Sequence, residues 1–236
     1  MQTRDQIEDI VKKGLVEDVF RMERAYALLR TSGEWAQEIN AAGRGNFGEL
    51  FGSLQAALIT EAVLALARIY DTPDKRYPTR CLIGVLDHLI KYSEELPKIR
   101  EPYQLKISLL TRVVPDELIK AIEISPDKFP LLLAKYVKAE SELSEHINTL
   151  EKLKTFRDKA LAHNERASPI SGPSWDDLHG LLELAKYVIG ALGWAYFSTA
   201  YTVNGEYLLS KDAKQPSLAL SRLLKKLYGE IYPSTT

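Results

Sequence analysis

Apolar residues recur at helical spacing along most of the chain, and no stretch shows strand alternation bounded by hairpin turns. At the N-terminus, Thr3 to Gln6 have the spacing of a capping box, and one apolar side follows. That side consists of Ile7, Ile10, Val11, Leu15 and Val19. A chain of 236 residues is long enough to bury a continuous core. We therefore expect an all-α protein, a bundle of long antiparallel helices in a single domain over residues 1–236.

Proline, glycine and capping residues indicate where these helices end. The pattern predicts helices over about residues 4–31, 47–70, 79–96, 126–163, 174–204 and 216–228, with shorter helical pieces over 97–125. A short segment over 34–42 leads to a turn. The helix over 126–163, broken at most near Pro130, would be about 50 Å long, so it must protrude or pack on a partner. The run from Tyr187 to Val203 has about 17 residues without a charge, and we interpret it as a buried helix rather than a membrane span.

The net charge and the single cysteine restrict which partners and which cellular compartment we expect for the protein. The formal net charge is −1, so a site for a polyanion requires a local basic patch. The single cysteine, Cys81, excludes an internal disulfide and favours a reducing compartment. The polar start of the chain is not typical of a secretion signal. We therefore expect a cytoplasmic protein that does not interact with a membrane.

The segment from Arg157 to His163 carries the strongest chemical signal. Metal-independent RNA cleavage needs a base for the ribose 2′-hydroxyl and a cation for the charge of the phosphorane, and His163 and Arg157 supply these. Asp158 could pair with a guanidinium or orient the imidazole, and Lys154 and Lys159 suit phosphate binding. On an ideal α-helix, Arg157 and His163 point about 120° apart, so one subunit does not close a site. Fraying at His163 or a second copy across a two-fold axis would close it.

A structural interpretation of the same segment stays open. Arg157 and Asp158 could be ordinary surface charges of a helix, and His163 could interact with the dipole at the end of that helix. The spacing alone does not exclude this, because an arginine followed by a histidine occurs by chance in many helical proteins.

Residues 156–164 resemble the signature of the HEPN superfamily, an arginine and a histidine separated by four to six residues. Residues 66–71 and 80–86 resemble the abortive-infection AbiU-like branch, in which an Arg-x-x-Asp closes one helix. The resemblance implies a helical, usually homodimeric protein of the HEPN type, often a metal-independent endoribonuclease in phage defence or toxin–antitoxin systems. It places Arg157 and His163 at the signature positions. Arg68 and Asp71 match the branch pattern and are expected in a helix-end ion pair; Asn164 is a weaker candidate.

The resulting expectation is a cytoplasmic homodimer that cleaves RNA without metal or cofactor, with a cognate antitoxin or defence protein as a partner. One alternative is a non-catalytic protein of the same fold that binds RNA, a nucleotide or a partner protein. A di-iron bundle enzyme is a third class, but the residue three positions before His146 is Leu143, so the Glu-x-x-His template is not met there.

Overall fold

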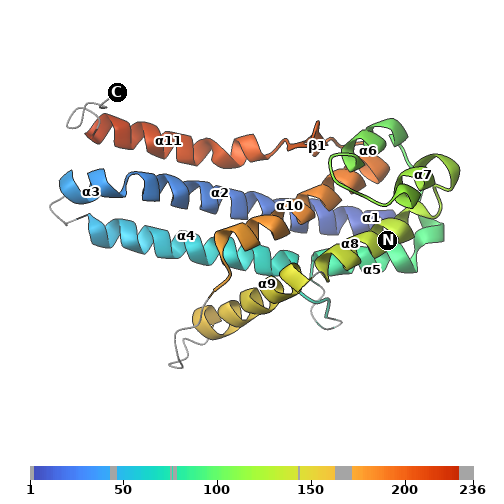
Figure 1. Cartoon of the computed structure of the whole chain (residues 1–236), viewed down its shortest axis with the longest axis horizontal. Coiled ribbons are helices and arrows are strands. Elements are labelled where there is room, and N and C mark those ends of the chain that lie inside the picture. The colour runs from blue at the N-terminus through green and yellow to red at the C-terminus, as the bar shows by residue number, and fades with distance from the viewer. Residues whose placement is uncertain are drawn as a thin grey trace. The chain divides into compact units, whose positions relative to one another are not determined.

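The computed structural model describes residues 3–42, 47–74, 76, 79–142, 144–162 and 172–228. The described chain is almost entirely helical, with one two-stranded sheet (Figure 1), so the predicted all-α class is confirmed. The chain forms two compact units. Unit 1 contains residues 1–19 and 66–208, and unit 2 contains residues 20–65 and 209–236.

The predicted N-terminal helix is present and continuous. It consists of α1 (Thr3–Ile10), the π-helical segment η1 (Val11–Leu15) and α2 (Val16–Glu34), and it ends close to the predicted Gly33. Within unit 1, four apolar residues at helical spacing have no exposed surface: Ile7, Val11, Leu15 and Val19. The Thr3 hydroxyl at the start of α1 donates to Oε2 of Glu95 at 2.8 Å.

Helix α10 (Trp175–Leu192) is the core of unit 1, and every residue from Leu184 to Leu192 is buried. It packs against α6 (Pro102–Leu109), α8 (Phe129–Ser141) and α9 (Ser144–Thr155). Its first turn is closed by a capping box: Asp177 N donates to Ser174 Oγ at 3.2 Å, and Ser174 N donates to Asp177 Oδ2 at 3.1 Å. The predicted start of this helix is therefore confirmed, and its apolar run is buried from Tyr187 to Gly193, whereas Val203 at the end of the predicted run is 42% exposed.

Replacing Ser174 by alanine is expected to lower the free energy of unfolding by about 1 kcal/mol at neutral pH, because an N-cap is lost. The hydrogen bonds from Ser174 lower the pKa of Asp177 in the folded protein. A carboxylate whose folded pKa is depressed stabilises the fold above its unfolded pKa, and this contribution disappears as pH falls through the folded pKa. Chemical denaturation at several pH values should show the difference between wild type and S174A narrowing below about pH 4. A difference that stays constant with pH would contradict the role of the capping box.

The predicted end of this helix at Asn204-Gly205 is wrong. After Leu192 a π-helical segment, η4 (Gly193–Phe197), leads to Ser198 in the left-handed region, and strands β1 (Thr202–Val203) and β2 (Glu206–Tyr207) then pair antiparallel. Asn204 (φ 50°) and Gly205 (φ 80°) form the turn between the strands. An Asn-Gly pair provides the positive φ that a helix end and a hairpin turn both require, so the local signal did not distinguish them.

The long helix predicted over 126–163 is also wrong as a single element. Helix α8 ends at Ser141, with Glu142 as its C-cap, and α9 starts at Ser144. Pro130 does not break α8, because it lies in the first turn, where no intrahelical donor is lost. Helix α5 (Leu82–Lys91) packs against α8, and the short α6 and α7 (Asp116–Ile124) confirm the predicted helical pieces in this region. The 3₁₀ turn η2 (Ser93–Glu95) follows α5.

Unit 2 contains most of α2, α3 (Ala36–Ala42), most of α4 (Gly48–Ile69) and α11 (Ser210–Tyr228). Ile39, Leu224 and Tyr228 form a buried cluster there, covered by the partly buried Trp35, Phe51 and Leu220. The predicted last helix therefore exists, but it begins at Ser210, and Pro216 lies inside it.

Helix α4 is long and apolar enough to span a membrane by length and composition, with a mean hydropathy of 1.7 over its best 18-residue window. Of that window, 28% is buried within the protein. The core helices of soluble proteins share this length and composition.

Candidate active site

Arg157 lies where α9 passes into the π-helical segment η3 (Phe156–Ala162). The angle of about 120° between Arg157 and His163 applies to an ideal α-helix, whereas a π-helix has wider turns with i→i+5 hydrogen bonds. Single π-helical turns occur often at functional sites. His163 is the residue directly after this segment; both His163 and Asn164 lie outside the described residues.

Two carboxylates hold the Arg157 guanidinium. Nε donates to Oδ1 of Asp158 at 2.7 Å, and Nη1 lies 3.5 Å from Oδ1 of Asp71. The hydrogen bond to Asp158 raises the pKa of Arg157, and the charge of Asp71 adds to this effect while partial burial opposes it. Arg157 is therefore a permanent cation, and its side chain remains partly exposed beside a pocket.

Asp71 comes from a distant part of the sequence, just after the last turn of α4. Its Oδ1 also accepts a hydrogen bond from the Thr72 amide at 3.0 Å. A carboxylate at the C-terminal end of a helix is unfavourable to the helix dipole, so the adjacent guanidinium compensates an electrostatic cost. Asp71 belongs to the Arg-x-x-Asp pattern, and Arg157 belongs to the arginine–histidine motif. The contact therefore joins the two motifs, and their spacing in the sequence does not reveal it.

A surface pocket of about 290 Å³ lies beside this contact. One wall is the end of α4, with Ala67, Tyr70, Asp71 and Thr72, and the other is α9 and η3, with Leu150, Glu151, Leu153, Lys154 and Arg157. The candidate phosphate ligand Lys154 is exposed and lines this pocket, whereas Lys159 is exposed and is not among the lining residues. Two cations, Lys154 and Arg157, thus line the pocket together with two carboxylates, Asp71 and Glu151.

Tyr70 fixes the wall formed by α4. Its hydroxyl donates to the carbonyl oxygen of Leu181 in α10 at 2.7 Å, and burial raises its pKa. A buried phenol that already donates to a backbone carbonyl is suited to holding two helices together, not to proton transfer. Tyr70, Thr72 and Glu151 were missed as site residues by the sequence analysis. For the α9 wall a signal existed, because Leu150, Lys154 and Arg157 share one helix face.

Arg68 does not face Arg157 but binds Asp18. Both Nε and Nη2 of Arg68 contact Oδ1 of Asp18, at 2.9 and 2.8 Å, and the Asp18 side chain is only 10% exposed. Arg68 and Asp71 are therefore both in ion pairs near the end of α4, each with a residue of another helix. Arg68 has a structural role in this arrangement.

Replacing Arg68 by alanine is expected to lower the free energy of unfolding by about 1–3 kcal/mol, because a buried carboxylate loses its partner. Lys13→Ala is the matched control: Lys13 is 71% exposed and pairs with Asp9 at 3.0 Å, so its loss should cost less than about 1 kcal/mol. Urea denaturation of both variants measures the difference. Equal effects would mean that Asp18 does not depend on Arg68.

Gly172 lies close to Phe156, the first residue of the segment that resembles the HEPN signature. A Cβ atom on Gly172 would lie 3.2 Å from Cδ2 of Phe156, so the backbone passes close to this ring.

Among the described residues, no group of three or more histidine, cysteine or carboxylate side chains could hold a metal ion. In α10, Nδ1 of His179 lies 3.8 Å from Oε1 of Glu183. Cys81 is fully buried.

Comparison with known protein families gives a match over most of the chain. A family model described as AbiU2, of the HEPN group, matches residues 4–215. Searches of curated proteins and of solved structures gave no significant match. The matched range covers most of the chain and includes the whole of the pocket beside Arg157.

Proposed function

Because the chain belongs to the AbiU2 family of HEPN proteins, we propose that it is a metal-independent endoribonuclease of a phage-defence or toxin-type system. The supporting observation is the placement of Arg157. It is a permanent cation at the edge of a pocket shared with Lys154, and the titratable imidazole of His163 follows within the same motif.

In the proposed reaction, His163 accepts the proton of a ribose 2′-hydroxyl, and the 2′-oxygen attacks the neighbouring phosphorus. The bond from phosphorus to the 5′-oxygen breaks, and the protonated His163 returns the proton to that oxygen, which leaves a 2′,3′-cyclic phosphate and a 5′-hydroxyl. Arg157 stabilises the charge that develops on the phosphorane oxygens, since a guanidinium fork suits two oxygens at once. Asp158 and Asp71 orient that guanidinium, and Lys154 and Lys159 attract the phosphate chain.

We also propose that the active form is a cytoplasmic homodimer, because side chains six residues apart, such as Arg157 and His163, would point about 120° apart on an ideal α-helix. A two-fold axis would bring both motifs to one cleft. Light scattering on the purified protein should give twice the chain mass of 26.6 kDa. A monomer that cleaves RNA at full rate would contradict this part of the proposal.

The test of the reaction is cleavage of end-labelled RNA by the purified full chain in the presence of EDTA. The expected products carry 2′,3′-cyclic phosphate and 5′-hydroxyl ends. An oligonucleotide with a 2′-deoxyribose on the 5′ side of the cleaved bond should be resistant, because the internal nucleophile is absent. Cleavage of that oligonucleotide, or cleavage that requires a divalent cation, would contradict the mechanism.

The engagement of Arg157 by two carboxylates also favours a second candidate, a non-catalytic protein of the same fold that binds RNA, a nucleotide or a defence partner. In that case Arg157, Asp158 and Asp71 only join η3 to α4. The absence of cleavage of a broad set of RNAs, together with a stability loss in Arg157→Ala, would favour this function over the first.

A further inference from the structure

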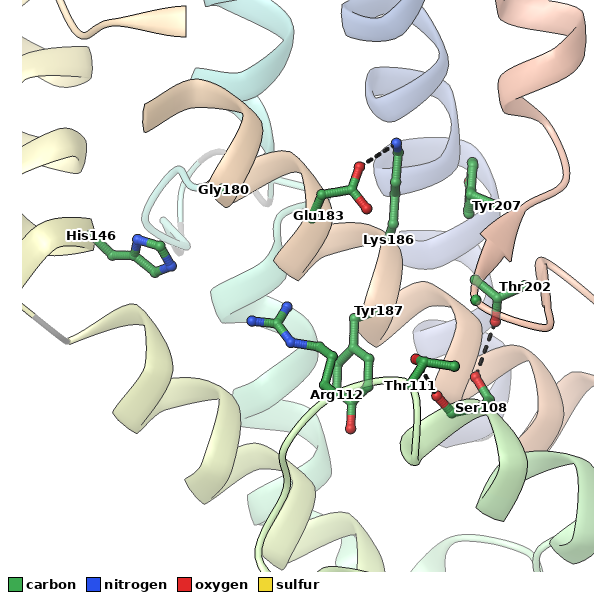
Figure 2. A pocket seen from close by; sticks show the side chains of 11 residues that line it. Ser108, Thr111, Arg112, His146, Gly180, Glu183, Lys186, Tyr187, Thr202 and Tyr207 are labelled. Atoms are coloured by element: carbon green, nitrogen blue, oxygen red, sulfur yellow. Dashed lines mark hydrogen bonds and ion pairs between the residues drawn. The ribbon is translucent and has the colours of Figure 1, made fainter. Parts of the chain in front are cut away.

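We propose that unit 1 contains a second site, separate from the Arg157 pocket, that binds a small sugar phosphate, free or as a nucleoside monophosphate. The site is a pocket of about 330 Å³, in the size range of small-molecule sites. Its walls come from the turn after α6, from α9, from α10 and from the β1–β2 hairpin (Figure 2). Binding at this pocket does not depend on the proposed ribonuclease activity.

Arg112 supplies the anion-binding group. Its Nη2 donates to Oε2 of Glu140 at 3.2 Å, and its guanidinium lies 5.3 Å from the centre of the Tyr187 ring. A guanidinium has five N–H donors, so the bond to Glu140 leaves others for a phosphate. Figure 2 shows the guanidinium directed to the side of the pocket where His146 projects from α9. An imidazole N–H is a second donor to the same anion.

The rest of the lining is polar but not cationic overall, which suits a neutral polyol. The ammonium of Lys186 donates to Oε1 of Glu183 at 2.6 Å, which neutralises its charge. The Glu183 side chain remains 47% exposed and can accept hydrogen bonds from sugar hydroxyls. Oγ of Ser108 and Oγ1 of Thr202 lie 3.1 Å apart; since only one hydrogen joins them, the other hydroxyl hydrogen can be donated.

The ligand must be compact. Tyr187 and Tyr207 are 6% and 7% exposed, so their rings offer little face for a stacked base. Each cation of the lining has a carboxylate partner, Glu140 for Arg112 and Glu183 for Lys186. With His146 neutral this group therefore has no net charge, which suits one phosphate monoester better than a polyanion. These observations favour a sugar phosphate over a nucleic-acid chain.

The hairpin that sequence analysis missed is part of the site. Thr202, Gly205 and Tyr207 all line the pocket, so the left-handed turn at Asn204-Gly205 builds one wall. The wall is fixed to η4, which directly follows α10, because the indole of Trp194 donates to the carbonyl oxygen of Thr202 at 3.0 Å. A rigid wall reduces the entropy that binding would otherwise cost.

The test is isothermal titration calorimetry of the full chain with ribose 5-phosphate, adenosine monophosphate, inorganic phosphate and ribose. We expect saturable 1:1 binding of at least one phosphorylated sugar, and at least tenfold weaker binding of ribose. Arg112→Gln should weaken binding at least tenfold. Lys106→Gln is the matched control, because Lys106 pairs with Glu123 on the surface and does not line the pocket, and it should bind as wild type does.

A second variant tests the same pocket independently, in case Arg112→Gln does not fold. Gly180 lines the pocket on α10, and a Cβ there would meet only Cε1 of His146 at 3.4 Å, so Gly180→Leu should fold and fill the cavity. It should lose binding while keeping the wild-type melting temperature or a higher one. Binding that survives in both variants, or no saturable binding to wild type, overturns the proposal. Loss of binding in Arg157→Ala would also overturn it, because the anion would then occupy the other pocket; failure of RNA cleavage alone leaves this result unaffected.

Discussion

Replacing Arg157 by alanine is expected to lower the rate constant of RNA cleavage about 10²–10³-fold, as expected when one preorganised donor to a developing oxyanion is removed. The guanidinium is fixed by Asp158 at 2.7 Å and by Asp71 at 3.5 Å, so little reorganisation is needed when a phosphate arrives. Single-turnover cleavage with excess protein measures this step directly. Arg157→Lys should recover only part of the rate, because an ammonium keeps the charge but cannot form the bidentate fork.

Lys152→Ala is the matched control for this prediction. Lys152 is an exposed cation on the same helix, and it does not line the pocket beside Arg157. Its loss should change the cleavage rate less than about threefold. The free energy of unfolding should change by no more than about 1 kcal/mol in either variant, because the Arg157 ion pairs are partly exposed. If Arg157→Ala lowers the cleavage rate only because less of the protein is folded, Arg157 has a structural role.

Replacing His163 by alanine is expected to lower the cleavage rate about 10²–10⁴-fold, the range typical of a general acid or base. The pH dependence should identify the role. An unperturbed imidazole has a pKa of about 6.5, and a base acts only when unprotonated, so the wild-type rate should rise with pH through that range. The acid limb of the profile should disappear in the residual activity of His163→Ala.

His179→Ala is the control for this second prediction. The His179 ring is 62% exposed and lies 3.8 Å from Glu183, away from the pocket beside Arg157. It should keep both the wild-type rate and the wild-type pH profile. A His163→Ala variant that cleaves RNA as fast as His179→Ala would contradict the proposed mechanism.

Together these variants separate the two candidate functions. In the ribonuclease, Arg157 and His163 affect the rate far more than the stability. In a non-catalytic protein, the same substitutions would change only the stability or the affinity for a partner. The contact between Asp71 and Arg157 is expected in both cases, because it orients the guanidinium whether or not the protein is catalytic.

Where neighbouring residues decide the structure, the sequence predicted it well. The burial of Ile7, Val11 and Leu15 follows from helical spacing, and the predicted helix start at Ser174 is set by a capping box between residues three apart. Local signals failed where one residue pair suits two structures. Asn204-Gly205 was predicted to end a helix but forms a hairpin turn, because both structures require positive φ.

The sequence by itself determined the helical class, most helix starts and the motif from Arg157 onward, because periodicity, capping and short motifs act within a few residues. Only the tertiary structure decided that Asp71 meets Arg157, that Tyr70 joins α4 to α10, and that Arg112, His146 and Thr202 line one pocket. These contacts join segments that are far apart in the chain. Their geometry depends on how whole helices pack, which no short sequence window encodes.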